Sequence, residues 1–409
     1  MTCPTKTRAL ARSIIQQMDD VGVWQRDFLL DLFDLWLCIH GRYNFTHLAR
    51  YDERDESTFR HNFAKSFDFF QLNLHLVKQH LSQDTIIAFD PSYITKSGKC
   101  TDGTGHFYSG SAGQIKWGME ASGLAAIDLQ NKVALHLDMV QTVDRHESET
   151  LLDYYASIII ARKDRLQSIS RHLAVDAYFS RHPFVDQLVT EGFEVTTRLR
   201  KDAKIRYIYR GPREKRRGRP QQFDGYVDVR ELRSDVFTPC AIDENNKWIA
   251  YHAVVNVEAL KRKVVLVVVH DLNGDGEVSG HRLYVSTDWE LDGGEVLHIY
   301  QCRFQQEFLY RDAKQELGLE HCQAYSWQKN DYHFNVALTV GSLAKVAYHL
   351  RDPGQPVGAF SIADVKQRHM NEYQARRILS LCRLDLDEAL IRKLLPEISN
   401  FGLRDYKRA

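Results

Sequence analysis

Between residues 85 and 200 the chain alternates short apolar runs with amphipathic segments, and this order constrains the fold more than any other feature. The run Thr85-Ile-Ile-Ala-Phe-Asp90 is short, apolar and closed by a carboxylate, as expected of a buried strand in an α/β sheet. Two further strands are predicted at 118–128 and 132–141, and Gln130-Asn131 between them favours a hairpin. A helix at 147–165, a strand at 171–176, a helix at 183–191 and a strand at 193–200 complete the series.

This series predicts a mixed α/β sheet with antiparallel strands first, which is the order of the RNase H-like fold. Residues 201–285 differ, because β-branched and aromatic runs separated by turn residues predict an all-β insertion. The helical period returns at 294–317 and again after Gln323, and the first 80 residues are also helical in pattern. We therefore predict an RNase H-like core at 82–200 and 286–345, a β-rich insertion at 201–285, and helical regions at 1–81 and 346–409.

Overall charge excludes some classes of protein. The 409 residues include 54 Lys and Arg and 54 Asp and Glu, so a uniformly basic nucleic-acid coat and an acidic tail protein are excluded. Seven scattered cysteines without a Cys-x-x-Cys pair argue against a disulfide framework or a zinc knuckle. No apolar run approaches the length of a membrane span, and the first residues lack the apolar core of a signal peptide. These features predict a soluble, cytoplasmic protein without membrane association.

The N-terminal region contains two short predicted helices with a tight polar joint. Asn44 is the expected N-cap of a helix at 45–51, and Ser57 that of a helix at 58–64. This pattern is typical of a helix-turn-helix, whose second helix would present Arg60, His61 and Lys65 to a DNA groove. A joint in an ordinary helical bundle is an equally good interpretation.

Three acidic residues, Asp90, Asp176 and Glu307, fall where this topology brings ends of elements together. Neighbouring parallel strands that both end in Asp place two carboxylates side by side, which is costly unless a cation neutralises them. Mg²⁺ is bound by one or two carboxylates together with water and phosphate oxygens. The sequence therefore predicts a site for two-metal phosphoryl transfer.

The predicted helix at 294–317 carries four functional side chains on one face. At roughly 100° per residue their spacing of three, four and seven places them within about 60° of arc; they are Tyr300, Arg303, Glu307 and Lys314. Arg and Lys beside a metal-binding carboxylate suit a polyanionic substrate. The alternative is a solvated face with salt bridges to Asp312 or Glu316. Leu297, Phe304 and Phe308 lie beside this face and are expected to dock the helix on the sheet.

These residues resemble a known family. Tyr300-x2-Arg303-x3-Glu307-x6-Lys314 is similar to the signature of the bacterial insertion-sequence DDE transposases that cut and paste through a DNA hairpin. Asp90-Pro-Ser92 and Asp176-Ala-Tyr-Phe179 resemble the first and second carboxylate motifs of that group. The segments 286–288 and 311–319 also resemble it, and the likeness covers about residues 86–350.

The resemblance implies roles for these residues. Asp90, Asp176 and Glu307 would hold two Mg²⁺ ions, for which Mn²⁺ can substitute, and Tyr300, Arg303 and Lys314 would hold phosphates at the transposon end. The partners implied are double-stranded DNA, both the terminal inverted repeats and the target, and a second copy of the chain on DNA. The location implied is the bacterial cytoplasm, associated with the nucleoid. In this family a tryptophan of the insertion often stacks on a flipped base, for which Trp248 is a candidate and Trp289 another.

Residues 198–219 form the clearest basic segment. The segment contains eleven Lys and Arg and only two acidic residues, Asp202 and Glu214, so its net charge is 11 − 2 = +9. The end of the segment, Arg217-Gly-Arg219-Pro220, resembles an AT-hook core, which lays Arg side chains into a narrow minor groove. A solvated loop is the ordinary alternative.

The leading hypothesis is a DNA transposase that cuts terminal inverted repeats and joins the freed 3′ ends to a target. Two alternatives stay open on the sequence alone: an RNase H-like metal-dependent nuclease, and a catalytically silent descendant that only binds DNA.

Overall fold

The computed structural model describes residues 3–143, 149–212, 220–245, 247–350, 359–384 and 389–403. The helices are α1 (Cys3–Ile15), α2 (Val23–Cys38), α3 (Phe45–Ala49), α4 (Glu56–Asn62), α5 (Phe69–His80), α6 (Leu151–Ile160), α7 (Lys163–Gln167), α8 (His182–Thr190), α9 (Gly293–Arg303), α10 (Gln305–Glu316), α11 (Trp327–His349), α12 (Ile362–Leu381) and α13 (Ala389–Ser399), with the 3-10 turns η1 (Ala177–Phe179) and η2 (Glu258–Leu260). The strands are β1 (Thr85–Ile94), β2 (Gly105–Ser109), β3 (Gln114–Asp128), β4 (Val133–Gln141), β5 (His172–Ala174), β6 (Glu194–Leu199), β7 (Ile205–Ile208), β8 (Phe223–Tyr226), β9 (Thr238–Ile242), β10 (Trp248–Val257), β11 (Arg262–Leu272) and β12 (Val278–Ser286).

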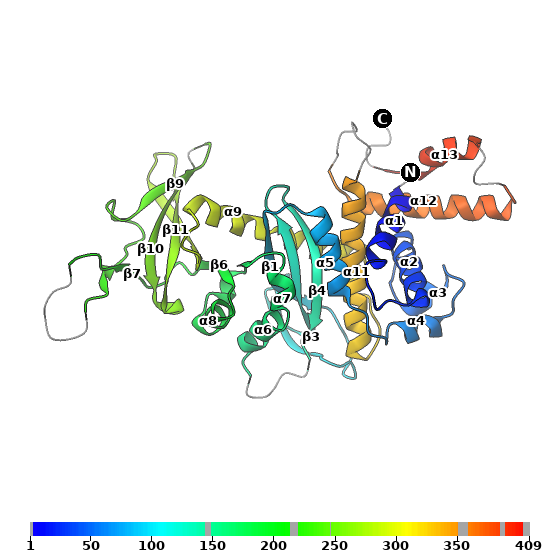
Figure 1. Ribbon diagram of the computed structural model, residues 1–409, viewed down its shortest axis with the longest axis horizontal. Helices are drawn as coiled ribbons and strands as arrows, with labels where there is room; N and C mark the ends of the chain where they lie inside the picture. Colours follow the sequence, from blue (N-terminus) through cyan, green and yellow to red (C-terminus); the bar gives the residue numbers. More distant parts are fainter. Residues whose placement is uncertain are drawn as a thin grey trace.

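The strands form one mixed sheet of 12 strands, with helices packed around it (Figure 1). Its first part runs in the order β4-β3-β1-β5-β6, in which β3 is antiparallel to both β1 and β4, and β1, β5 and β6 are parallel. This arrangement confirms the predicted mixed α/β sheet and is consistent with an RNase H-like fold. The 3-10 turn η1 and helix α8 join the parallel strands β5 and β6.

Several elements differ from the prediction. The predicted helix at 147–165 is two helices, α6 and α7, separated after Ile160. Strand β2 was not predicted, because it lies in a Gly- and Ser-rich segment without a long apolar run. β1 does not end at Asp90 but continues to Ile94, because it pairs with β3 along its whole length.

The strands of residues 201–285 continue the same sheet. β12 pairs antiparallel with β6, and β11, β10 and β7 follow in order. A second, smaller core lies between these strands and α9, where Val267, Tyr284 and Leu297 are buried. One side of this part of the sheet therefore positions α9, which carries Tyr300 and Arg303.

The N-terminal helices share the main core with the sheet and with α11. The indole Nε1 of fully buried Trp36 donates to the carbonyl of Leu317 at 2.9 Å, and the Tyr43 hydroxyl donates to the carbonyl of Glu316 at 2.8 Å. Figure 1 shows α1, α2, α11 and α12 together at the end of the molecule opposite β10. None of the described helices is both long and apolar enough to cross a membrane.

The two short N-terminal helices are present, with one corrected cap. Asn44 accepts from His47 N and caps α3, as predicted. The cap of α4 is Asp55, which accepts from Thr58 N, and not Ser57. The carboxylate of Asp55 also accepts from the hydroxyl of Ser57, so the stronger acceptor takes the cap position.

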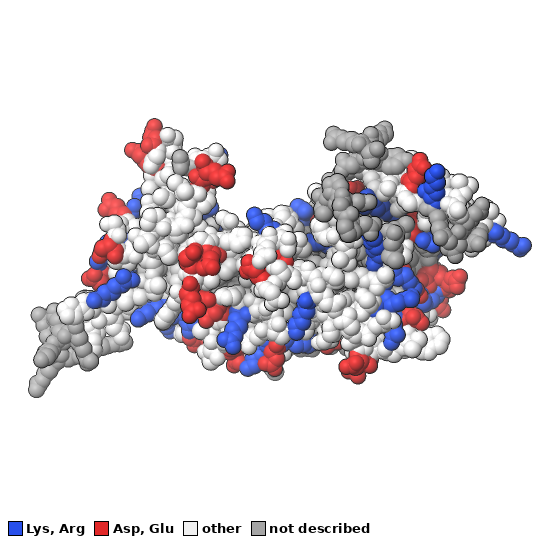
Figure 2. All heavy atoms as spheres, turned by 45° about the horizontal axis from the view of Figure 1, so that its top comes forward, with Lys and Arg blue, Asp and Glu red and all other residues white. Residues whose placement is uncertain are grey.

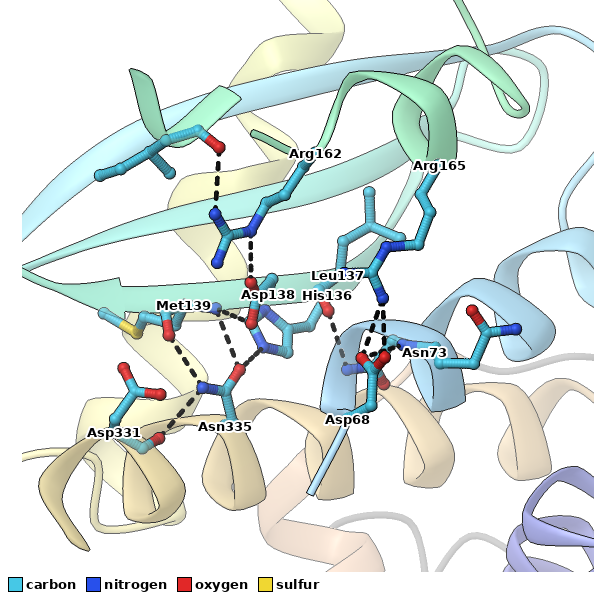
Figure 3. Close-up of polar contacts among 12 residues, drawn as sticks. Asp68, Asn73, His136, Leu137, Asp138, Met139, Arg162, Arg165, Asp331 and Asn335 are labelled. Carbon is cyan, nitrogen blue, oxygen red and sulfur yellow. Dashed lines mark hydrogen bonds and ion pairs between the residues drawn. The ribbon is translucent and has the colours of Figure 1, made fainter. Parts of the chain in front are cut away.

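A buried polar network joins β4 to α11 (Figure 3). Asn335 accepts from His136 Nε2 and from Met139 N at 3.0 and 2.9 Å, and donates to the carbonyl of Met139 at 2.8 Å. Beside it, Arg162 pairs with Asp138 at 2.7 Å. Because His136 and Asn335 are buried, their hydrogen bonds are needed to offset the cost of burial.

Asp331 in this network predicts a pH-dependent stability. Burial, together with the nearby charge of Asp138, raises the pKa of Asp331 to about 7. A carboxyl whose pKa is raised by folding stabilises the fold below its unfolded pKa, and this contribution is lost as the pH rises through about 7. Asp331→Asn should therefore raise the melting temperature at pH ~8 by a few degrees, and the gain should vanish near pH ~4. Thermal unfolding of both proteins across this range tests it; a gain that is the same at every pH contradicts the assignment.

Candidate active site

Asp90 and Asp176 come from adjacent parallel strands. β1 and β5 pair Ala88 with Ala174, so the two aspartates, each two positions further along, are neighbours at the same level of the sheet. Asp176 follows β5 and caps η1, where its Oδ1 accepts a hydrogen bond of 2.9 Å from Tyr178 N. The predicted pairing of these two carboxylates is thus present in the fold.

The charge on Asp90 is disfavoured by its surroundings. The pKa of Asp90 is raised to about 7, mainly by burial. The positive charges of Arg303 and Lys314 lower this pKa, whereas the negative charges of Asp176 and Glu307 raise it. Burial also raises the pKa of Asp176, against the nearby Arg303. The other two predicted carboxylates, and the predicted cations Arg303 and Lys314, therefore lie near enough to Asp90 to act on its charge.

The predicted helix at 294–317 is interrupted at Phe304. α9 ends at Arg303 and α10 begins at Gln305, and short-range hydrogen bonds, Phe304 N to Gln301 O and Glu307 N to Phe304 O, replace the regular pattern. The expectation that Phe304 docks the helix is wrong, since this side chain is 49% exposed and contacts Phe308 instead. Leu297 is buried, as predicted.

Arg303 and Glu307 bridge this interruption as an ion pair. Arg303 Nη2 lies 2.8 Å from Glu307 Oε1; the arginine side chain is 9% exposed and the glutamate 39%. The guanidinium also lies over the Tyr300 ring at 5.5 Å. Its Nε is buried and has no hydrogen-bond partner in the described part of the chain. In the described part of the chain, Arg303 and Lys314 form no salt bridge to Asp312 or Glu316, and Arg303 pairs with Glu307 instead.

Tyr300 lies on α9 and Lys314 on α10, on either side of the interruption. The Tyr300 ring packs against Tyr284 of β12 with centroids 4.9 Å apart. Burial raises the pKa of the Tyr300 phenol, and Arg303, Asp176 and Arg198 also act on it. Lys314 Nζ donates to the carbonyl of Tyr93 at 2.7 Å and lies 3.5 Å from Glu320. Arg198, from β6, is a site neighbour that the helix pattern did not indicate.

Two hydrogen bonds that the sequence did not predict hold α10 on the sheet. The Tyr310 hydroxyl donates to the carbonyl of Asp90 at 2.5 Å, and Gln306 Nε2 donates to the carbonyl of Gly123 at 2.8 Å. Gly123 is the β3 partner of Asp90, and a Cβ there would meet the Tyr310 hydroxyl at 2.2 Å. A glycine is therefore required for this close approach of helix and strand.

The site was tested for its fit to a divalent cation. Among the described residues, no three His, Cys, Asp or Glu side chains form a group that could hold a metal ion. Glu307 instead pairs with Arg303. The carboxylate donors nevertheless suit a hard cation, because a positive charge between Asp90 and Asp176 would remove the repulsion that helps raise the pKa of Asp90.

The other predicted DNA contacts that the structure describes have partners of their own. Arg60 pairs with Glu56 and lies over the Phe45 ring at 5.2 Å, and Lys65 donates to Asn62 at 3.2 Å. Trp248 begins β10 and packs, half-buried, against the smaller core, whereas Trp289 is 59% exposed. Arg217 and Arg219 lie outside the described residues. These residues remain predicted DNA contacts.

Charges of both signs are intermixed over the described part of the face drawn in Figure 2. The basic segment at 198–219 nevertheless begins at the active site, since Arg198 in β6 acts on Tyr300. The zero net charge therefore conceals a local basic segment that begins next to the carboxylates.

Comparison with known protein families gives a match for this chain. The chain matches the sequence model of the family described as the transposase DDE domain over residues 82–340, which is more than half of its length. No curated protein matches the chain. Members of this family bind DNA and use divalent metal ions to cut and join it. The match spans the sheet from β1 to β12 and helices α9 and α10, and with it the chain belongs to the transposase DDE domain family.

Proposed function

We propose that this DDE transposase cuts the ends of a transposon and joins them to target DNA through a DNA hairpin intermediate, with Asp90, Asp176 and Glu307 as its catalytic carboxylates. The observation that carries the proposal is the meeting of β1, β5 and the α9–α10 junction. This junction places Arg303 and Glu307 close enough to Asp90 to shift its pKa. We propose that the β-rich region 201–285 is an insertion into an RNase H-like core at 82–200 and 286–345.

The three carboxylates would hold two Mg²⁺ ions, or Mn²⁺ in their place. When bound, the ions supply activation of the attacking water or 3′-hydroxyl and charge neutralisation at the leaving oxygen. The protein would position the carboxylates that hold the ions. Tyr310 fixes α10, which carries Glu307, to β1, which carries Asp90.

Arg303 is suited to bind a phosphate of the DNA. Its Nε lacks a partner among the described residues, and a guanidinium can grip two phosphate oxygens at once. A phosphate that takes Arg303 releases Glu307 from its ion pair, so DNA binding and completion of the carboxylate site are coupled. Tyr300 and Lys314 would contact phosphates on either side.

DNA contacts beyond the site are proposed for the helical region 1–81, through Arg60 and Lys65, and for the basic segment, through Arg217 and Arg219. A base-stacking role is proposed for Trp248. Two copies would act on two ends, with contact through the helical region 346–409. Exposed apolar side chains on α12 and near α13 support this contact, among them Ile378, Leu381 and Phe401.

The proposal is tested with purified protein, Mg²⁺, the inverted repeats that flank the gene, and a supercoiled target plasmid. The expected products are hairpin-capped ends on a denaturing gel, followed by target DNA joined to both 3′ ends. Cleavage without joining would identify a metal-dependent nuclease instead. Binding without cleavage would identify a silent descendant.

A further inference from the structure

A two-stranded ribbon extends the sheet beyond the active site. β3 is longer than β1: their pairing starts at Met119, opposite Ile94, the last residue of β1. The earlier residues of β3 pair with β2 alone, from Gly105 opposite Gly118 to Ser109 opposite Gln114. This ribbon, residues 105–118, is coloured cyan in Figure 1.

One face of the ribbon is aromatic and exposed. Directly paired residues of antiparallel strands share a face, as do residues two positions apart, so His106, Trp117, Tyr108 and Ile115 lie on one side. Tyr108 is 63% exposed, Ile115 67% and Trp117 39%. Contiguous exposed apolar side chains on a protruding element are typical of a binding surface.

The ribbon is connected to the active site through Tyr93. The carbonyl of Tyr93 accepts from Lys314 Nζ at 2.7 Å, and its hydroxyl donates to the carbonyl of Trp117 at 2.6 Å. A Cβ on Gly118 would lie 2.6 Å from the Tyr93 hydroxyl, so this contact too depends on a glycine. At ~3.3 Å per residue, Trp117 lies about 20 Å along β3 from the strand position opposite Asp90.

The charge of the ribbon favours a polyanion as its partner. Residues 105–118 contain no Asp or Glu, and Lys116 is exposed on the face opposite the aromatic one. Lys99, in the loop before the ribbon, is also exposed. Aromatic side chains beside lysines are the combination that proteins use to bind unpaired nucleic acid, because every base has a face that can stack.

We propose that the aromatic face of this ribbon binds unpaired DNA next to the cleavage site, with bases stacked on Tyr108 and Trp117 and with Lys99 at a phosphate. Lys99 follows Gly98, whose carbonyl accepts from Trp117 Nε1 at 3.1 Å. The inference rests on the proposed function, because a strand has to be cut or opened at Asp90 before unpaired DNA reaches the ribbon. It assigns to residues 105–118 a contact that the catalytic carboxylates do not supply.

The test measures binding of a fluorescein-labelled oligothymidylate of about 20 nucleotides by anisotropy, in EDTA so that no cleavage occurs. Tyr108→Ala/Trp117→Ala should weaken binding by about tenfold or more, since stacking contributes ~1–3 kcal/mol per base. Lys99→Ala should lower the slope of log Kd against log salt by about 0.7, whereas Lys116→Ala, on the opposite face, should leave it unchanged. Trp24→Ala is the matched control, because Trp24 in α2 is 90% exposed and far along the chain from the ribbon.

The outcomes separate the two proposals. If the wild type binds the oligonucleotide and the ribbon variant binds equally well, the ribbon inference is wrong while the proposed function stands. If the wild type binds neither this probe nor inverted-repeat duplex, the proposed function fails. Loss of a dimer in sedimentation, with unchanged DNA affinity, would assign the face to a second copy of the chain. A melting temperature of each variant equal to that of the wild type establishes that the fold is intact.

Discussion

Glu307→Gln is expected to slow strand cleavage by about 10³-fold or more while DNA binding persists. Glutamine keeps the size of the side chain and an oxygen for Arg303, but its neutral amide is a poor ligand for a hard divalent cation. Loss of the negative charge also weakens the 2.8 Å pair with Arg303, so phosphate binding should be retained or strengthened. Single-turnover cleavage of inverted-repeat DNA in Mg²⁺, with affinity measured in EDTA, gives both quantities.

Asp312→Asn is the matched control for this variant. Asp312 lies on α10 as Glu307 does, and its ion pair is with Arg311, at 3.4 Å. The Asp312 side chain is 24% exposed, and removing its charge should change the cleavage rate by no more than about twofold. If Glu307→Gln cuts at the wild-type rate, or if Asp312→Asn loses as much activity, Glu307 is not a catalytic carboxylate.

Gly123→Ala is expected to cause the largest combined loss of stability and activity for a change of one methyl group. The added Cβ would lie 2.2 Å from the hydroxyl of Tyr310, a side chain that is 8% exposed and is held by its hydrogen bond to the carbonyl of Asp90. Overpacking of this kind costs typically ~1–3 kcal/mol. A displacement of α10 by about 1 Å would also reduce catalysis by about 10²-fold, because it moves Glu307 away from Asp90. Denaturant unfolding and the cleavage assay measure the two effects.

A second substitution distinguishes this steric cause from a general loss of folding. Tyr310→Phe removes the clashing hydroxyl, after which the nearest ring carbon is 3.1 Å from the new Cβ. The double variant should therefore be more stable than the sum of the two single losses predicts, by about 1 kcal/mol or more. Additive losses would show that the contact between Gly123 and Tyr310 does not position α10.

The sheet and the pairing of the two aspartates follow from local features of the sequence. Short apolar runs at β1 and β5, and the hairpin signal between β3 and β4, are sufficient to predict a mixed sheet with its antiparallel strands first. Strands that run parallel side by side then bring Asp90 and Asp176 together whatever the details of the loops. The dense helical pattern at 294–317 likewise predicts where the remaining site residues lie.

The interruption at Phe304 was not predictable, because no Pro or Gly marks it. Its cause is tertiary. α9 packs through Leu297 on the smaller core beside β10 and β11, whereas α10 packs through Tyr310 on β1 and β3. Two docking surfaces on one sheet require two helix directions, and the chain turns at the residue left exposed between them. The cap of α4 and the ribbon at 105–118 were missed for a local reason, since both depend on polar or small residues without periodicity.

The central claim, that Asp90, Asp176 and Glu307 form one cation site, is tested most directly by Mn²⁺ binding. Electron paramagnetic resonance titration would follow free Mn²⁺ with the protein bound to inverted-repeat duplex, for the wild type, Asp90→Asn, Asp176→Asn, Glu307→Gln and the control Asp312→Asn. We predict that the wild type and the control bind Mn²⁺ equally and that each of the other three variants binds at least about tenfold more weakly. Wild-type affinity for Mn²⁺ in all three carboxamide variants would contradict the claim.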